Sequence, residues 1–146
     1  CGCPSARVES WGVNTATQYL PTVVPSMLSH WPIKLALVSP QAPYFDGADL
    51  IVNADCVPFA YANFHQDFLK DRVVVIGCPK LDDHVLYLQR LTNIFQQSNL
   101  RSIMVIHMEA PCCFGLHHLV KTALAQSCKN IPLEHVVISI KGERKK

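Results

Sequence analysis

The chain has 146 residues, 49% of them hydrophobic, and a formal net charge of +2. This length fits one domain, and the apolar content suffices for a real core. The small charge argues against a nucleic-acid surface, and the basic C-terminal cluster is expected to be a solvated tail. No apolar run approaches the roughly 18 residues of a membrane-spanning helix, and no signal peptide is evident. We therefore expect a soluble, cytoplasmic protein that contacts neither nucleic acid nor a membrane.

The first 32 residues contain four prolines and two tryptophans and have no sustained hydrophobic period. We therefore expect an irregular N-terminal arm over residues 1–32, followed by an α/β domain over residues 33–146. The chain begins at Cys1 rather than at a methionine, which leaves open whether it is a processed product or a fragment of a longer protein. Homo-oligomerisation is open as well.

From Ile33 onward, short apolar runs alternate with longer amphipathic ones, which is typical of a parallel sheet flanked by helices. Runs rich in Val, Ile and Leu predict five strands, at 33–38, 49–54, 72–77, 102–107 and 135–140. Helical spacing predicts three helices, at 59–69, 82–97 and 114–127, the second of them capped by Asp82 or Asp83. The predicted fold is a three-layer α/β domain, with a mostly parallel five-stranded sheet of the Rossmann or flavodoxin type and flanking helices.

Six of the seven cysteines lie beside glycine, proline, aspartate or another cysteine, in CGCP, ADCVP, GCPK and APCCFG. Their odd number and the apolar composition favour free or metal-bound thiols over a disulfide scaffold. Cys56, Cys78 and the pair Cys112 and Cys113 follow three consecutive predicted strands. Because parallel strands end at one edge of a sheet, we expect these four thiols to converge there, on one iron or zinc centre.

The adjacent cysteines Cys112 and Cys113 allow two arrangements, because neighbouring side chains diverge in an extended chain. Either a turn brings both to one centre, or only one of them binds. In the second case the fourth position belongs to solvent or to one of three side chains: Cys3, His65 or His107.

His107 and Glu109 lie one residue apart in HMEAPCC and are the candidate catalytic residues. They are suited to orient a cluster sulfur, relay protons or bind a second metal; the alternative is a hydrogen-bonded core histidine and an exposed glutamate. The C-x-C spacing of Cys1 and Cys3 leaves their role open, whereas Cys128, at the end of a predicted helix, is expected to be structural.

The stretches ADCVPFAYANFHQDFL, VIGCPKLDD and HMEAPCCFGL, with CGCP and HWPIKLALVSPQAPYF before them, resemble the C-terminal domain of ferredoxin-type iron–sulfur proteins of anaerobic bacteria and archaea. The resemblance covers nearly all of the chain. In those proteins a segment with two [4Fe–4S] motifs typically precedes such a domain, and the family has no assigned reaction. The resemblance implies anaerobic iron–sulfur redox biology, with four positions matching the family's cysteine motifs: Cys56, Cys78, Cys112 and Cys113. The clustered C-x-x-C-x-x-C ligands of the ferredoxin segment are absent from this sequence.

The leading hypothesis is a domain of an iron–sulfur oxidoreductase, with a cluster expected to be [4Fe–4S], that exchanges electrons with a ferredoxin-like segment or a redox partner protein. A metal-free thiol–disulfide enzyme is an alternative, in which Cys112 and Cys113, or Cys78 with one of them, cycle between dithiol and disulfide. A structural zinc domain is the third hypothesis.

Overall fold

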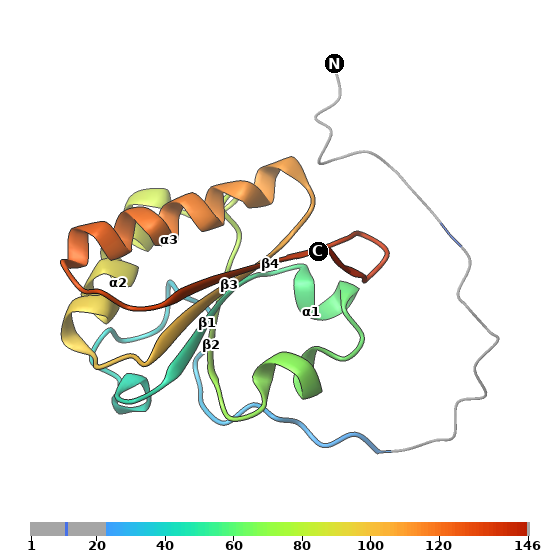
Figure 1. Cartoon of the computed structure of the whole chain (residues 1–146), viewed down its shortest axis with the longest axis horizontal. Coiled ribbons are helices and arrows are strands. Elements are labelled where there is room, and N and C mark those ends of the chain that lie inside the picture. The colour runs from blue at the N-terminus through green and yellow to red at the C-terminus, as the bar shows by residue number, and fades with distance from the viewer. Residues whose placement is uncertain (1–10, 12–22, 146) are drawn as a thin grey trace.

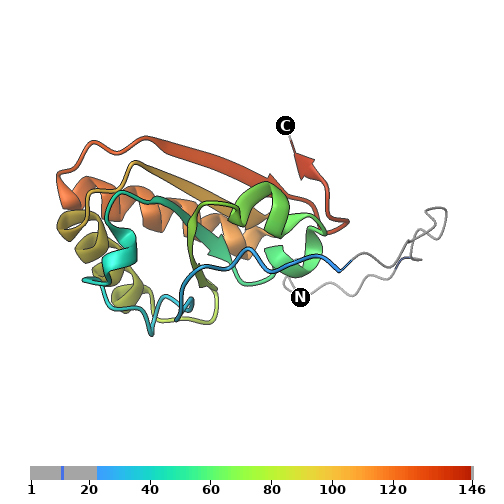
Figure 2. The same cartoon turned by 90° about the horizontal axis from the view of Figure 1, so that it is seen from below.

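The computed structural model describes Trp11 and residues 23–145. In this part of the chain, a sheet is covered on one face by two long helices and on the other by two short helical segments (Figure 1, Figure 2). The long helices are α2 (His84–Gln97) and α3 (Phe114–Ser127), and the short segments are α1 (Val57–Ala60) and a π-helical turn, η3 (His65–Leu69). Residues 23–32 have no regular secondary structure, and the rest of the predicted arm except Trp11 lies outside the described residues.

The described sheet has five strands in the order β2–β1–β3–β4–β5. They are β1 (Asp49–Ala54), β2 (Val73–Gly77), β3 (Ser102–Met108), β4 (Leu133–Ile138) and β5 (Arg144–Lys145). The first four are parallel, and β5 pairs antiparallel with β4. This arrangement confirms the predicted α/β fold with a mostly parallel five-stranded sheet and flanking helices.

The strand order creates a point where the direction of winding reverses. The chain passes from β1 to β2 on one side and then returns over β1 to β3 on the other. Because such crossovers are right-handed, the segments after β1 and after β3 leave toward opposite faces of the sheet. A crevice outside the carboxyl ends of these two strands is the usual ligand position in open α/β sheets.

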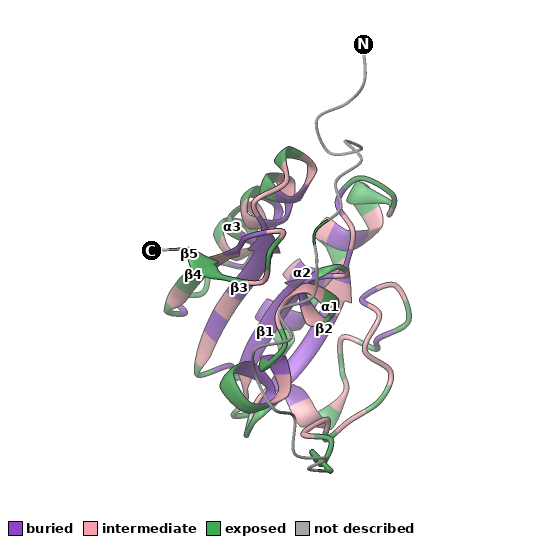
Figure 3. Cartoon of the chain, turned by 90° about the vertical axis from the view of Figure 1, so that its right-hand side faces the viewer, coloured by how far each residue is buried: buried purple, intermediate pink, exposed green. Residues whose placement is uncertain are grey.

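The core lies between the sheet and its helical layers, and Figure 3 shows mostly buried residues along β1 and β2. Five of the six residues of β1 are buried, as expected for a central strand with both faces covered. Helix α2 begins at an N-cap, Asp83, whose carboxylate accepts the backbone N–H groups of Val85 and Leu86. No helix among the described residues is long and apolar enough to cross a membrane.

The predicted strand at 33–38 is wrong. Lys34 forms a single parallel bridge to Ile76, and the chain then turns, with the Leu37 N–H donating to the Lys34 carbonyl. Leu35 and Val38 are nevertheless almost fully buried. An apolar run predicts burial, but it does not distinguish a strand from a buried turn. The fifth strand is instead β5, whose residues are a basic pair without an apolar signal.

The predicted helix at 59–69 is also wrong, because two separate segments replace it. Helix α1 ends at Ala60, where Tyr61 takes extended backbone angles, and η3 begins only at His65. The buried side chains of Val57 and Phe68 therefore reach the core from different turns. The strand predicted at 135–140 begins two residues earlier, at Leu133, and ends at Ile138.

Candidate functional site

The four predicted thiols follow β1, β2 and β3. Cys56 is the exposed N-cap residue of α1, and Cys78 comes directly after the last residue of β2. Cys112 and the buried Cys113 lie in a 3-10 turn (Pro111–Cys113) that leads into α3. The structure therefore has these residues at the carboxyl edge of the sheet, as the sequence predicts. Their role as ligands stays a prediction.

The thiols are close enough to influence one another's ionisation. Burial raises the pKa of Cys56, and the negative charges of Cys78, Asp55 and Cys112 raise it further. Burial likewise raises the pKa of Cys113 to about 12, with contributions from Cys112 and Cys56 that exceed the opposing effect of the Met108 amide. These Coulombic effects connect all four cysteines.

The turn Pro111–Cys113 sets the relative position of the two adjacent sulfurs. The Sγ atoms of Cys112 and Cys113 lie 4.0 Å apart, so the turn holds both sulfurs together instead of directing them apart. The 4.0 Å separation is well above a disulfide bond length, and both are free thiols. This proximity is compatible with both sulfurs at one centre, while which of them binds stays a prediction.

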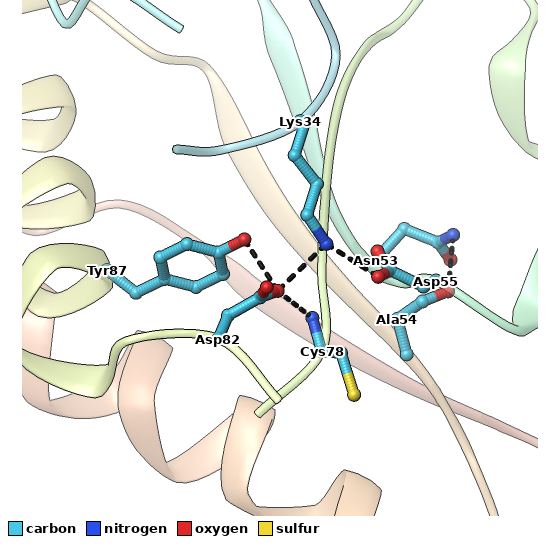
Figure 4. A network of polar contacts seen from close by, with 7 residues as sticks. All are labelled: Lys34, Asn53, Ala54, Asp55, Cys78, Asp82 and Tyr87. Carbon is cyan, nitrogen blue, oxygen red and sulfur yellow. Dashed lines mark hydrogen bonds and ion pairs between the residues drawn. The ribbon is translucent and has the colours of Figure 1, made fainter. Parts of the chain in front are cut away.

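A polar network lies behind the Cys78 thiol (Figure 4). The Lys34 ammonium bonds to Asp55 Oδ2 at 2.6 Å and to Asp82 Oδ2 at 2.8 Å. Asp82 Oδ2 also accepts the backbone N–H of Cys78 at 2.6 Å and the Tyr87 hydroxyl at 2.7 Å. The network therefore connects the segment before β1, the ends of β1 and β2, and helix α2, and it fixes the backbone of Cys78.

The ionisation of the network follows from these contacts. Burial acts to raise the pKa of Asp82, but the hydrogen bonds from Cys78 N–H, Lys34 and Tyr87 outweigh it and lower the pKa. Burial acts to lower the pKa of Lys34, and the bonds to Asp55 and Asp82 reverse this. Burial and the bond to Asp82 raise the pKa of Tyr87. Carboxylate, ammonium and neutral phenol are therefore the stable forms at neutral pH.

The sequence predictions missed this network, although its members left a signal. Lys34 is a charged residue inside an apolar run, and an aspartate lies beside Cys56 and four residues after Cys78. A half-buried lysine inside an apolar run needs a carboxylate partner, so these aspartates were the natural candidates. Their pairing across 21 and 48 residues requires the fold.

His107 is a hydrogen-bonded core histidine, with no exposed surface. Its Nδ1 contacts the Met108 carbonyl at 2.7 Å and therefore carries a proton, and its Nε2 lies 2.6 Å from His135 Nε2. The His135 ring stacks on His117, with ring centroids 4.0 Å apart. The Phe114 ring, which follows Cys113, contacts His107 edge-on. The three histidines thus form a cluster between β3, β4 and α3.

Glu109 stabilises the C-terminal strand. Its carboxylate accepts the Ile140 N–H at 2.9 Å and forms an ion pair with Lys145 of β5. The hydrogen bond from Lys145, with that from Ile140, lowers the pKa of Glu109. Among the described residues, no hydrogen bond of His107 or Glu109 goes to a cysteine. Their action on a cluster stays a prediction.

The remaining candidate residues lie elsewhere. His65 Nδ1 accepts the backbone N–H of Met27, and Cys128 is the exposed, left-handed residue that ends α3. Cys1 and Cys3 lie outside the described residues. Within residues 23–145, no group of three or more His, Cys, Asp and Glu side chains is arranged to hold a metal ion. The four thiols therefore lie at one edge without the compact geometry that a single zinc ion requires.

Comparison with known proteins identifies the fold family. The sequence profile of the Rossmann-like domain matches residues 42–145, which is most of the chain. The chain belongs to the Rossmann-like domain family. An uncharacterized protein of Archaeoglobus fulgidus is 32% identical over 115 residues, which cover 79% of this chain and 81% of the archaeal protein. No solved structure gives a significant match.

This Rossmann-like domain differs from the dinucleotide-binding type at the turn that follows its first strand. That turn reads DCVPFA, without the glycines that let a pyrophosphate approach the backbone. A cysteine occupies the switch point instead. Since a fold of this class hosts many functions, the function has to be argued from the thiols themselves.

Proposed function

We propose that the thiols of Cys56, Cys78, Cys112 and Cys113 hold an iron–sulfur cluster, of the [4Fe–4S] type, and that this domain transfers single electrons. The partner would be a ferredoxin-like segment or a separate redox protein of an anaerobic, cytoplasmic oxidoreductase. One electron would enter from a reduced partner and leave to an oxidised one, so that no bond in this chain is made or broken. The observation that carries the proposal is that four thiols follow three neighbouring strands, β2, β1 and β3, at the carboxyl edge of the sheet.

Four cysteine thiols are ligands that suit an iron–sulfur cluster better than a single zinc ion. Four cysteine thiolates are the usual ligand set of a [4Fe–4S] cluster, in which each sulfur binds a different iron. The ligands are therefore spread more widely than around one zinc ion. When bound, a cluster supplies a one-electron redox centre and the positive charge that keeps buried thiols deprotonated.

The protein contributes a fixed backbone around the thiols. The Asp82 carboxylate holds the Cys78 amide, and the turn Pro111–Cys113 holds the Cys112 and Cys113 sulfurs together. The N-terminus of the 14-residue helix α3 follows Cys113 directly, and its dipole favours negative charge at that position. These features would restrain the ligands during a change of oxidation state.

The metal content of anaerobically purified full-length protein tests the proposal. We expect iron and acid-labile sulfide in comparable amounts, visible absorption that a one-electron reductant bleaches, and a paramagnetic resonance signal in the reduced form. Iron and sulfide that remain absent after anaerobic reconstitution would reject the cluster. Stoichiometric zinc without sulfide would support the structural zinc alternative.

A metal-free dithiol is the second candidate, favoured by the 4.0 Å contact between Cys112 Sγ and Cys113 Sγ. Oxidation would join the two sulfurs, release two protons and pass two electrons to a disulfide partner, which becomes a dithiol. The raised pKa of Cys113 opposes this reading, since the thiolate is the attacking form. Thiol titration separates the two: an iron-free protein that gains two titratable thiols on reduction would favour the dithiol enzyme.

A further inference from the structure

Two carboxylates lie beside proposed cluster ligands, and one cation pairs with both of them (Figure 4). Asp55 directly precedes Cys56 in the sequence, and Asp82 accepts the backbone N–H of Cys78 at 2.6 Å. The Lys34 ammonium bonds to Asp55 Oδ2 at 2.6 Å and to Asp82 Oδ2 at 2.8 Å. With two carboxylates and one ammonium, the group keeps a net charge of −1 next to two of the four thiols.

The backbone positions Lys34 independently of its side chain. The Ile76 N–H donates to the Ile33 carbonyl at 2.8 Å, and the Leu35 N–H donates to the Ile76 carbonyl at 3.0 Å. The Leu35 side chain is almost fully buried. These contacts hold the segment next to the end of β2 whatever side chain follows Ile33. A neutral residue of similar length can therefore replace the lysine and remove only its charge.

The charge of this group reaches the thiols. Burial and the negative charge of Cys78 raise the pKa of Cys56, and the Asp55 carboxylate raises it further. A carboxylate that disfavours negative charge on a sulfur also disfavours an added electron on a centre that this sulfur binds. The side chains of Lys34, Asp55 and Asp82 are 29%, 34% and 21% exposed, so water screens their charges in part. We therefore expect a moderate effect for each unit of charge.

We propose that Lys34 sets the reduction potential of the cluster, because its ammonium offsets one of the two carboxylates beside Cys56 and Cys78. This inference rests on the proposed function, which concerns the presence of the cluster, whereas the inference concerns its potential. Net charge around an iron–sulfur cluster is one of the factors that set its potential, and negative charge favours the oxidised state. A neutral residue at position 34 therefore lowers the potential, and a neutral residue at position 55 raises it.

Reduction potentials of the reconstituted full chain test this inference. Anaerobic redox titration compares the unmodified protein with K34M, D55N and the double variant K34M/D55N. We expect K34M to lower and D55N to raise the equilibrium constant of one-electron reduction at least about threefold, or about 28 mV at about 59 mV per tenfold. The double variant restores the net charge of −1 and should return close to the unmodified potential. A purely structural role of the ion pairs predicts instead that the double variant departs furthest.

Arg101 and Asp49 supply the control, because they form an ion pair at the opposite edge of the sheet, where β1 and β3 begin. R101M and D49N should leave the potential unchanged. Equal shifts in these controls, identical potentials in all variants, or a double variant further from the unmodified protein than either single variant would overturn the inference. D55N decides the sign of the effect even if K34M does not fold. Iron and sulfide are measured in every sample, and their absence from the unmodified protein would reject the proposed function and this inference together.

Discussion

The Asp82 carboxylate accepts the backbone N–H of Cys78 at 2.6 Å, which joins a structural ion-pair network to one of the four thiols. The same oxygen, Oδ2, also accepts bonds from Lys34 and Tyr87. The loop after β2 is thus held by a group whose own position depends on β1 and α2. The conformation of Cys78 is therefore coupled to the stability of the whole carboxyl edge.

The first prediction is that D82N destabilises the fold. The substitution keeps the shape of the side chain but removes the charge that three donors share, so we expect a loss of about 2 kcal/mol of unfolding free energy. D83N is the matched control, since asparagine is as good an N-cap as aspartate and should change stability by less than about 0.5 kcal/mol. Urea unfolding followed by circular dichroism measures both. Equal effects of the two variants would contradict the network.

The second prediction concerns Gly77, which lies under the Tyr87 ring. A Cβ at this position would overlap Tyr87 Cε2, and the ring is almost fully buried and held by its hydrogen bond to Asp82. We expect G77A to cost about 1–3 kcal/mol and to break the Tyr87–Asp82 bond. G115A is the control, because its Cβ would meet only Pro79 Cβ at 3.4 Å and alanine is favoured in a helix by about 1 kcal/mol. Thermal unfolding measures both variants, and equal melting temperatures of G77A and G115A would contradict this prediction.

The third prediction is a loss of stability in mild acid, due to the histidine cluster. Burial, followed by the nearby Lys121, His107 and His118, lowers the pKa of His117. Burial, followed by His117 and His107, lowers the pKa of His135. In the unfolded chain the histidine pKa values are about 6.5. Just below about pH 6.5, the unfolded chain therefore binds more protons than the folded protein. The stability that the neutral rings contribute is present above about pH 6.5. It is lost as the pH falls toward the lower pKa values that His117 and His135 have in the folded protein.

The measurement is the urea midpoint at about pH 7.5 and at about pH 5.5. We expect a lower midpoint in acid for the native protein and a smaller difference between the two pH values for H135Q. H118Q removes an exposed residue of α3 that makes only the smallest of the named contributions to the lowered pKa of His117, so it should reduce the difference less than H135Q does. A native difference that persists in H135Q would show that other groups are responsible.

The sequence was sufficient for the parts of the fold that depend on local composition. The run VVVIG predicts β2 and the run DLIVNA predicts β1, because parallel strands that are covered on both faces are apolar nearly throughout. The position of Cys78 after a strand follows from the same pattern. Turns that bury apolar side chains, such as the one that buries Leu35 and Val38, carry no distinct pattern, and β5 pairs through backbone bonds that its basic side chains do not indicate.

The candidate site was predictable only in part. The thiols follow strand ends, and parallel strands share an edge, so their common location could be predicted. The Lys34 ion pairs and the contact between His107 and His135 join residues 21 to 48 positions apart. Such pairs depend on strand order, and a single sequence does not define it. The partners of His107 and Glu109 were unpredicted for the same reason.

The central claim is that four particular sulfurs hold one cluster, and iron and sulfide content across a cysteine series tests it most directly. The full chain and the variants C56S, C78S, C112S, C113S and C128S are purified and reconstituted without air. We predict that each of the first four loses more than about half of its iron and sulfide, while C128S, changed at the exposed end of α3, retains both. Equal content in all five variants, or none in the unmodified protein, would contradict the account.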